Sequence, residues 1–505
     1  MPLQDAILRG SRDYPSRPAL LFEDRTWSYE DLNAITDRIA TNLLAAGLQP
    51  GDRVGLLFAN GPGIVFSYYA CFKAGLIAVP LNIRMKGPEL AYVLNHSGCR
   101  MLLGQADLYR ALEPVRADIP ALERCYIEEG EPTILGDQPF EALQQEAQNG
   151  PELPAVGDDE IAVIIYTSGT TARPKGVMHP HEVLHGFCES NVAHIREKIV
   201  VINAAVPSLA HIGSLGGIML TTYHAGGTML VFSQFDPKAL LEGIQKHRVT
   251  GFWLLPVMYA ALLQVPDIAS YDLSSLRLCL SAGDSLPTPI RERFRALCGR
   301  EIVEFCGMTE IPYCCNPLDE GNRPGSIGKP VPGVRIRLVD DQGAEVPRGE
   351  VGEILAQSKI MMRGYWRDPE ATAQTMQGGW IHTGDLAWED ADGYYWFAGR
   401  KKDIILRGGS NIAPAEVEEA LCTHPAVFAA GVVGAPDPIW GQAVWAFVAL
   451  RPNAHTDEAE LKEHLQGRLA DYKLPETIRI LPALPIGLTG KIHRQTLREW
   501  AAQAK

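Results

Sequence analysis

Residues 166–176 concentrate the groups that bind phosphate. The segment reads Tyr-Thr-Ser-Gly-Thr-Thr-Ala-Arg-Pro-Lys-Gly. Glycines let backbone N–H groups converge on an anion, hydroxyls add donors, and a lysine adds a mobile positive charge. The segment is not a Walker loop, because Pro174 stands before Lys175 where that pattern requires glycine. Apart from a plain surface turn, the simplest interpretation is a phosphate-binding loop of another kind.

The same segment resembles the phosphate loop of the acyl-adenylate-forming enzymes, which include acyl-CoA synthetases, adenylation domains of peptide synthetases and luciferases. That loop reads Tyr-Thr-Ser-Gly-Thr-Thr-Gly-x-Pro-Lys-Gly, and this chain departs from it at Ala172. The resemblance implies ATP as a substrate and Thr170 as a contact of its Mg²⁺. The loop residues that it assigns to the nucleotide are Thr167, Ser168, Gly169, Thr170, Thr171 and Lys175.

A second motif of this family resembles residues 307–310, Gly-Met-Thr-Glu. The resemblance places Gly307 and Met308 beside the nucleotide, Thr309 at the α-phosphate and Glu310 on Mg²⁺, a hard cation that suits a carboxylate. The family's aromatic residue, which packs on adenine, is replaced by Cys306, with Phe305 one place earlier. Either adenine loses a stacking partner here or the contact is made differently.

Two further stretches match the family's nucleotide contacts. Gly283 and Asp284, in Ser-Ala-Gly-Asp, resemble the stretch that lines the adenine and acyl pockets, although a simple Gly-Asp turn stays open as an alternative. Asp385, in Trp-Ile-His-Thr-Gly-Asp, would accept hydrogen bonds from both ribose hydroxyls. Arg400 would donate to the same sugar, unless it is only a solvated charge.

Two residues are expected at the reacting groups. The resemblance makes Lys491, in Thr-Gly-Lys-Ile, the cation that bridges the substrate carboxylate and the α-phosphate, two anions that must meet. It places His211 at the mouth of the acyl pocket, where Ala210 replaces the family's aromatic residue. Together with Ala210, three glycines predict a roomy or deep pocket: Gly213, Gly216 and Gly217.

A third set of residues points to a thiol acceptor. Gly408 and Gly409 open a segment that resembles the family's Gly-Gly-x-Asn-Ile-x-Pro-x-Glu, which faces the active site when the thioester forms. Glycine would let the pantetheine arm of coenzyme A pass close to the backbone. Trp440 also fits the synthetase branch of the family.

The elements that must position these motifs alternate between strand and helix, which predicts an α/β fold with largely parallel sheets. The resemblance implies a large N-terminal domain, residues 1–401, of stacked sheets layered with helices, in which 323–401 form a small β-rich subdomain. A mobile α+β domain, residues 402–505, would carry Lys491 and rotate about a hinge at Lys402. We expect helices over 414–423 and 456–470 in that domain.

Composition excludes several classes of protein. The chain has 505 residues, and its net charge of −14 argues against a nucleic-acid partner. Its ten cysteines have no metal-ligand spacing and fit a reducing compartment. Neither a signal peptide nor an apolar run of about 18 residues is found. We therefore expect a cytoplasmic protein with no integral membrane segment, and leave open a homodimer.

These observations predict an ATP-dependent carboxylic acid:CoA ligase that forms acyl-AMP and then acyl-CoA. The alternatives are a stand-alone adenylating enzyme that loads a carrier protein in trans and, disfavoured by the intact motifs, a non-catalytic nucleotide-binding relative. Residues 207–220 contain no Asp to pair an ammonium group and no Arg or Lys to pair a second carboxylate. The acid is therefore expected to be a monocarboxylic acid, either fatty or aryl.

Overall fold

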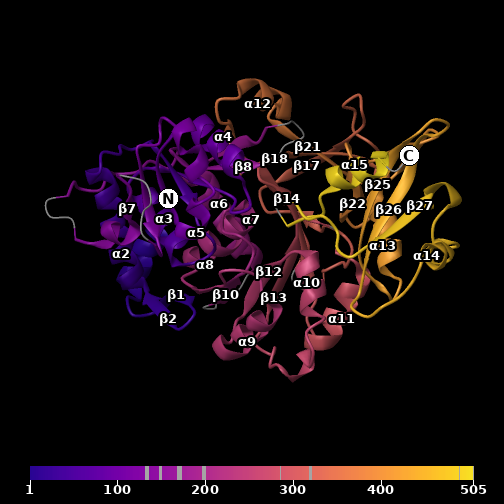
Figure 1. The fold of residues 1–505 in the computed structure, drawn as a ribbon, viewed down its shortest axis with the longest axis horizontal. Coiled ribbons are helices and arrows are strands. Elements are labelled where there is room, and N and C mark those ends of the chain that lie inside the picture. The colour runs from indigo at the N-terminus through magenta and orange to yellow at the C-terminus, as the bar shows by residue number, and fades with distance from the viewer. Residues whose placement is uncertain are drawn as a thin grey trace.

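The computed structural model describes residues 1–130, 136–146, 150–167, 173–195, 201–284, 286–317, 321–487 and 490–503. A large N-terminal domain of sheets and helices fills most of the molecule, and a smaller C-terminal domain lies at one end of its long axis (Figure 1). The predicted α/β fold is confirmed. The core of strand β8 (Ile161–Thr167) is buried, as its apolar run predicts, and β8 leads into the predicted phosphate loop.

The first large sheet runs in the order β19-β9-β8-β4-β3-β5-β6-β7. Its central strands are parallel, whereas at one edge β9 pairs antiparallel with β8 and β19 pairs antiparallel with β9. Its strands, besides β8, are β3 (Arg53–Leu57), β4 (Ile77–Pro80), β5 (Cys99–Gln105), β6 (Arg124–Glu128), β7 (Gln138–Pro139), β9 (Lys175–Pro180) and β19 (Gly364–Tyr365).

The second large sheet runs in the order β16-β15-β14-β13-β12-β10-β11-β1-β2. The strands from β1 to β14 in this order pair in parallel, and β2, β15 and β16 are antiparallel at the edges. Its strands are β1 (Pro18–Phe22), β2 (Arg25–Ser28), β10 (Ile202–Ala205), β11 (Thr228–Val231), β12 (Gly251–Leu254), β13 (Leu278–Ala282), β14 (Ile302–Met308), β15 (Ile311–Cys315) and β16 (Lys329–Pro330).

Helices follow the strands of both sheets. Ser28 caps α2, because its side chain accepts from the backbone N–H of Asp31 and the Asp31 side chain accepts from the backbone N–H of Ser28. The helices are α1 (Asp5–Asp13), α2 (Tyr29–Ala45), α3 (Pro62–Lys73), α4 (Gly87–Ser97), α5 (Ala106–Tyr109), α6 (His181–Ile195), α7 (Ile212–Ser214), α8 (Thr221–His224), α9 (Pro237–His247), α10 (Pro256–Leu262), α11 (Thr288–Cys298) and α12 (Pro369–Thr375), with a π-helix over Leu215–Leu220 and 3₁₀ turns over Glu113–Asp118, Phe140–Gln144 and Ile268–Ser270. Within the described ranges, none of them is long and apolar enough to cross a membrane.

Residues 323–401 are β-rich, but they do not all form one sheet. Five strands make an antiparallel sheet, whereas β16 and β19 from the same stretch join the edges of the two large sheets. This segment therefore links both large sheets to the third. The strands of the third sheet are β17 (Arg335–Val339), β18 (Gly352–Gln357), β20 (Met376–Gln377), β21 (Trp380–Glu389) and β22 (Tyr395–Arg400).

The C-terminal domain has its own sheet, in which β27 is parallel to β26 and the other pairs are antiparallel. The helix predicted over 456–470 is shorter, because it ends at Leu465 and Gly467 adopts a positive φ of 74° that interrupts the α conformation. The elements are β23 (Ile405–Arg407), β24 (Ser410–Ile412), α13 (Pro414–Cys422), β25 (Val427–Asp437), β26 (Gly441–Leu450), α14 (Glu458–Leu465), a 3₁₀ turn (Asp471–Lys473), β27 (Thr477–Leu481) and α15 (Arg494–Gln503).

Candidate active site

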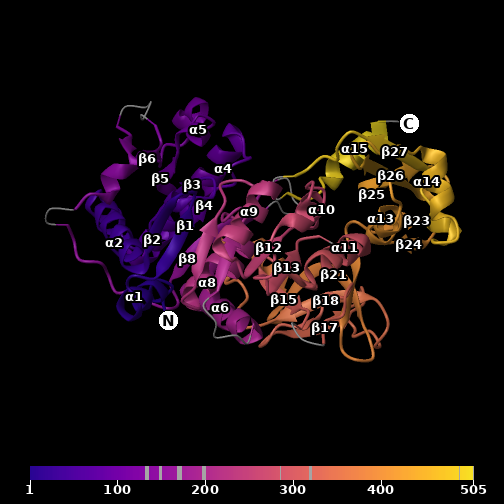
Figure 2. The same cartoon turned by 90° about the horizontal axis from the view of Figure 1, so that it is seen from below.

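A cavity of about 380 Å³ lies where the two large sheets meet the C-terminal domain. Its walls come from α6, the segment 212–218, the ends of β12, β13 and β14, and a C-terminal turn at Gly490 and Lys491. Figure 2 shows the yellow chain that precedes α15 reaching back towards α10. Six residues predicted for the site line this cavity: His211, Gly283, Gly307, Met308, Thr309 and Lys491.

Lys491 enters the cavity from the C-terminal domain. The side chain packs so closely on Gly283 that its Cε lies 3.2 Å from where a Cβ on that glycine would stand. The turn is held from the other side by Arg84, whose Nη1 donates to the carbonyl of Gly487 at 3.0 Å. Burial lowers the pKa of Lys491, and the charge of Arg400 lowers it further, against the effect of Asp284 and Asp385. A half-buried cation that is partly removed from water is stabilised by an anion, and a substrate can supply one.

His211 lies at the same cavity and is held through its loop. Asn60, which is buried, donates to the carbonyls of Val206 and Pro207 at 3.2 and 3.0 Å and accepts from the N–H of Leu209 at 2.8 Å. Burial, followed by the charge of Lys491, lowers the pKa of His211 to about 4. The imidazole is therefore neutral near pH 7. Sequence patterns did not point to Asn60, because a lone Asn after a strand carries no signal for a partner so distant in the chain.

Tyr365 contacts both the loop lysine, Lys175, and the predicted metal ligand, Glu310. Lys175 Nζ lies 5.1 Å from the ring centroid of Tyr365, and the Tyr365 hydroxyl donates to Glu310 Oε1 at 2.7 Å. Glu310 is 6% exposed. Burial raises its pKa, and the hydrogen bond from Tyr365 lowers it. Tyr365 could not be predicted as a site residue, because its Gly-Tyr-Trp context has no chemical signature.

Thr167 and Lys175 pair across β8 and β9, so they hold the two ends of the predicted phosphate loop together. The remaining predicted loop contacts lie outside the described residues: Ser168, Gly169, Thr170 and Thr171.

The predicted ribose ligands are adjacent in the third sheet. Asp385 and Arg400 face each other in β21 and β22, and Arg400 Nε lies 2.9 Å from Asp385 Oδ1. The Tyr313 hydroxyl donates to Asp385 Oδ2. Within the described residues, Oδ1 of Asp385 forms the ion pair with Arg400 but accepts no hydrogen bond. This oxygen is therefore suited to accept from a sugar hydroxyl.

Cys306 belongs to the same network. Its Sγ donates to the Tyr313 hydroxyl at 3.2 Å, and burial raises the pKa of the thiol to about 12, so that it stays protonated. Phe305, one place earlier, lines the cavity, and its ring centroid lies 6.4 Å from that of Phe187. A small thiol thus stands where an aromatic ring was expected.

The predicted width of the acyl pocket is only partly confirmed. A Cβ on Gly216 would lie 2.6 Å from the ring of Phe187, and one on Gly213 would lie 3.1 Å from Trp253. The space released by these two glycines is therefore filled by aromatic rings. Gly217, within the π-helix, has no atom within 4 Å of that point and leaves real space. Such π-helical turns are frequent at functional sites.

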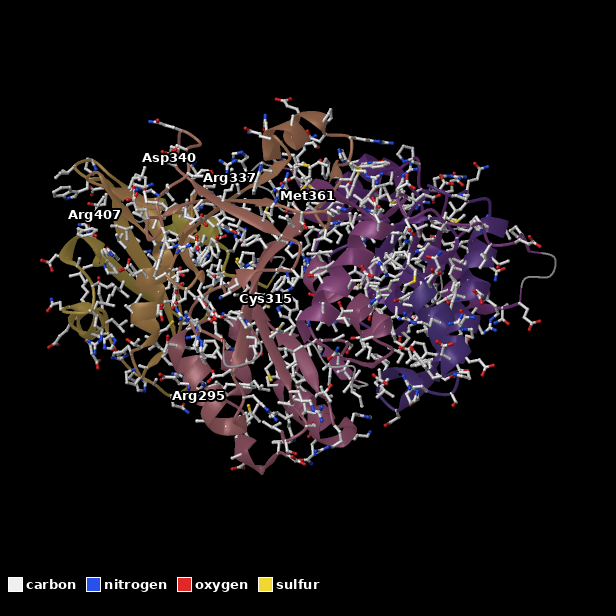
Figure 3. The ribbon with its side chains drawn as sticks, turned by 180° about the vertical axis from the view of Figure 1, so that it is seen from behind. Arg295, Cys315, Arg337, Asp340, Met361 and Arg407 are labelled. Carbon is white, nitrogen blue, oxygen red and sulfur yellow. The ribbon has the colours of Figure 1, made fainter. Side chains whose placement is uncertain are left out.

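The residues predicted for coenzyme A lie elsewhere. Gly408, Gly409 and Trp440 do not line the cavity, and the Trp440 side chain is 52% exposed. The N–H of Gly408 donates to the carbonyl of Trp440 at 2.8 Å, and a Cβ on Gly408, whose φ is +56°, would lie 2.7 Å from the indole. Figure 3 shows Cys315, which lines the cavity, near the middle of the molecule and Arg407, next to Gly408, at its outer side.

The predicted hinge lies between two anchored neighbours. Lys401 Nζ pairs with Asp341 at 2.8 Å and with Glu353 at 3.2 Å in the N-terminal domain. Asp403 pairs with Arg498 in α15 of the C-terminal domain. Lys402 is exposed in the turn between them. The side chains of Lys401 and Asp403 are thus fastened to different domains, while the N–H of Asp403 still donates to the carbonyl of Arg400 at 2.8 Å.

Comparisons with known proteins show the family to which the chain belongs. The sequence matches the AMP-binding enzyme family over residues 8–366 and the C-terminal domain of AMP-binding enzymes over residues 416–491. It is 37% identical over 499 residues to feruloyl-CoA synthase of an Amycolatopsis species, covering 97% of both chains.

Two further relatives differ in their thiol acceptor. The sequence is 33% identical over 506 residues to the fatty acid–[acyl-carrier-protein] ligase ScoC of Streptomyces coeruleorubidus, covering 97% of this chain and 95% of that one. The crystal structure of the anthranilate CoA ligase AuaEII in complex with anthranoyl-AMP superposes with a TM-score of 0.94 at 32% identity, covering 100% of this chain and 98% of that one. The chain therefore belongs to the AMP-binding enzyme family and is an AMP-forming acid–thiol ligase.

Proposed function

We propose that the protein is an ATP-dependent carboxylic acid:CoA ligase. The observation that carries this proposal is the position of Lys491, which is half-buried in a cavity that it shares with His211, within the electrostatic reach of Asp385 and Arg400. A carboxylate and a phosphate repel each other, and a cation between them stabilises the charge that develops as they react.

The first step is attack of a carboxylate oxygen of the acid on the α-phosphorus of ATP. The bond to the pyrophosphate breaks, which yields acyl-AMP and pyrophosphate. We assign Lys491 to the bridge between the two reacting groups, Thr309 to the α-phosphate and Lys175 to the outgoing phosphates. Asp385 and Arg400 hold the ribose. Because Cys306 is too small to stack on adenine, neighbouring groups pack against the base.

The site also fits Mg²⁺. This ion is usually held by one or two carboxylates together with substrate phosphates and waters. Glu310 offers one hard oxygen ligand, and Thr170 is the second residue that we assign to the ion. When bound, Mg²⁺ neutralises phosphate charge. Tyr365 keeps the Glu310 carboxylate oriented through its hydrogen bond and favours its ionised form.

In the second step the thiol of coenzyme A loses its proton and attacks the acyl carbon, and AMP leaves. We propose that the C-terminal domain, residues 402–505, rotates about Lys402 between the steps. The anchoring of Lys401 and Asp403 to different domains supports this hinge. The rotation would withdraw Lys491 and present Gly408, Gly409 and Trp440 to the acyl-AMP.

The acid that fits the cavity is a monocarboxylic acid with an apolar, preferably aryl, body. The rings of Phe187, Trp253 and Phe305 line the walls. Residues 207–220 contain no Arg or Lys, but Arg84 brings a cation to the cavity wall from another part of the chain. Its guanidinium already donates to the carbonyl of Gly487. The names of the feruloyl-CoA and anthranilate ligases support an aryl acid, and that of ScoC supports a fatty acid.

The test is pyrophosphate release with ATP and a panel of aryl and fatty acids that differ in length and ring content. Each acid is assayed alone, with coenzyme A and with a phosphopantetheine-bearing carrier protein, and the thioester is identified by mass spectrometry. We expect acid-dependent pyrophosphate release and an acyl-CoA product. A thioester formed only on the carrier protein would establish the alternative that ScoC represents, and no pyrophosphate with any acid would refute the proposal.

A further inference from the structure

His179 is a buried histidine that lines the cavity and that the proposed reaction does not use. It belongs to β9 and is only 3% exposed. Neither Nδ1 nor Nε2 makes a hydrogen bond within the described residues. Burying a polar group without a partner is unfavourable, so such a group in a ligand cavity points to a partner on the ligand.

Three other polar side chains of the cavity wall have partners. Asn191 donates to the Thr221 hydroxyl at 3.1 Å, and Asn203 donates to the Thr222 hydroxyl at 2.8 Å. His211 lies 3.4 Å from the amide nitrogen of Asn82. Among the cavity-lining residues that the structure describes, His179 is the one with side-chain nitrogen or oxygen atoms that are both buried and unbonded.

The imidazole of His179 suits recognition of a neutral polar group. Burial lowers its pKa to about 4, although a contact with the backbone of Thr309, which does not have hydrogen-bond geometry, acts in the opposite direction. A neutral imidazole carries one donor and one acceptor. Val183, Phe187 and Ile360 add apolar wall to the same cavity. A hydroxyl or amino group on an otherwise apolar acid could therefore pair with His179, whereas a second charge would be poorly accommodated.

We propose that His179 is a specificity residue that hydrogen-bonds a neutral hydroxyl or amino substituent on the acyl part of the acid. The substrate class would be an aryl carboxylic acid with such a substituent. This inference rests on the proposed function, because it assumes that the cavity receives the acid. His179 would contact the substrate body and not the reacting carboxylate.

The experiment compares substituted acids with their unsubstituted analogues in the full-length enzyme. The pairs are 4-hydroxycinnamate with cinnamate, 3-hydroxybenzoate with benzoate, and 2-aminobenzoate with benzoate. For at least one pair, we expect kcat/KM for pyrophosphate release to favour the substituted acid by on the order of 10–100-fold. His179→Leu should remove most of this preference by lowering the rate for the substituted acid while preserving that for its analogue.

Matched variants separate hydrogen bonding from shape. His179→Gln keeps a donor and an acceptor and should retain part of the preference, whereas Val183→Ala changes the wall without a polar atom and should affect both members of a pair alike. His179→Met replaces the leucine variant if that variant does not fold. Thermal unfolding without ligand should show no loss of stability in the apolar variants, because they remove an unbonded polar group.

The inference is overturned if the parent enzyme prefers no substituted acid, or if the preference stays within twofold of the parental value in both apolar variants. Calorimetric binding of the acids alone gives a readout that does not depend on turnover. If the parent binds a substituted acid through His179 but releases no pyrophosphate with any acid, the proposed function fails and the specificity role stands.

Discussion

Two regions of the C-terminal domain carry residues predicted for chemistry, and they face opposite environments. Lys491 is half-buried in the cavity between the domains, where the partial loss of water contact lowers its pKa. Gly408, Gly409 and Trp440 form an exposed surface away from that cavity. Both regions belong to one sheet-based domain, in which α13 and α15 pack on β25.

Under the proposed function, one arrangement of the domains serves only one of the two steps. The structure has Lys491 in the cavity, which is the arrangement that the proposed first step requires. The two domains are joined by contacts such as Arg84 with Gly487 and Thr288 with Glu419 at 2.8 Å. Such polar contacts can break and re-form during a rotation.

The largest effect should come from Lys491→Ala. Without the bridging cation, pyrophosphate release from acid and ATP should fall by about 10²–10³-fold. Thioester formation from isolated acyl-AMP and coenzyme A should stay close to the parental rate, because the lysine would have left the cavity by then. The control is Lys462→Ala, which removes a lysine in α14 of the same domain. Equal losses in both half-reactions would contradict the separation of the two regions.

Lys402→Pro should affect the two half-reactions in the opposite way. Proline fixes φ near −65° and removes the N–H, which would block one of two hinge states. We expect adenylation to stay within about tenfold, or about 1.4 kcal/mol of barrier, and the thioester step to fall much further. Lys402→Ala, which keeps the backbone free, should be nearly normal. Parental transfer from isolated acyl-AMP in the folded proline variant would show that Lys402 is not the hinge.

Trp440→Ala tests the exposed surface alone. If this surface receives the pantetheine arm, KM for coenzyme A should rise by about tenfold, which corresponds to about 1.4 kcal/mol of binding, with no change in pyrophosphate release. Ile480→Ala, a truncation of another exposed apolar residue in this domain, should change neither. An unchanged KM would remove Trp440 from the thiol site.

The smallest effect should come from a change at Tyr365, in the buried part of the site. Tyr365→Phe removes the hydrogen bond that lowers the pKa of Glu310, so burial should raise that pKa further. Because Glu310 would hold Mg²⁺ only when ionised, the acidic limb of the pH profile of pyrophosphate release should move to higher pH by about half to one unit. More Mg²⁺ should be needed at low pH. The control is Tyr472→Phe, which changes an exposed tyrosine of the C-terminal domain and should leave the pH profile unchanged. If the acidic limb does not move in Tyr365→Phe, Tyr365 does not support the metal site.

Much of this protein could be predicted from its sequence, because the relevant signals are local. Alternating apolar segments predict the sheets, Ser28 predicts a helix start, and the spacing of glycine, hydroxyl and lysine residues predicts a phosphate loop. Local signals also mislead: the helix over 456–470 was overextended past Gly467, and Gly213 and Gly216 leave room for aromatic rings of the protein itself.

The tertiary structure alone decided which side chains support the site. Tyr365 reaches Glu310, Tyr313 reaches Asp385 and Asn60 holds the His211 loop, each across at least 55 residues of sequence. His179 lies in β9 among apolar neighbours, where its sequence context is that of an ordinary buried strand. These pairings depend on which strands become neighbours and which faces they bury. Residue spacing along the chain determines the chemistry that a segment can perform, whereas long-range packing determines which partners and which cavity that chemistry meets.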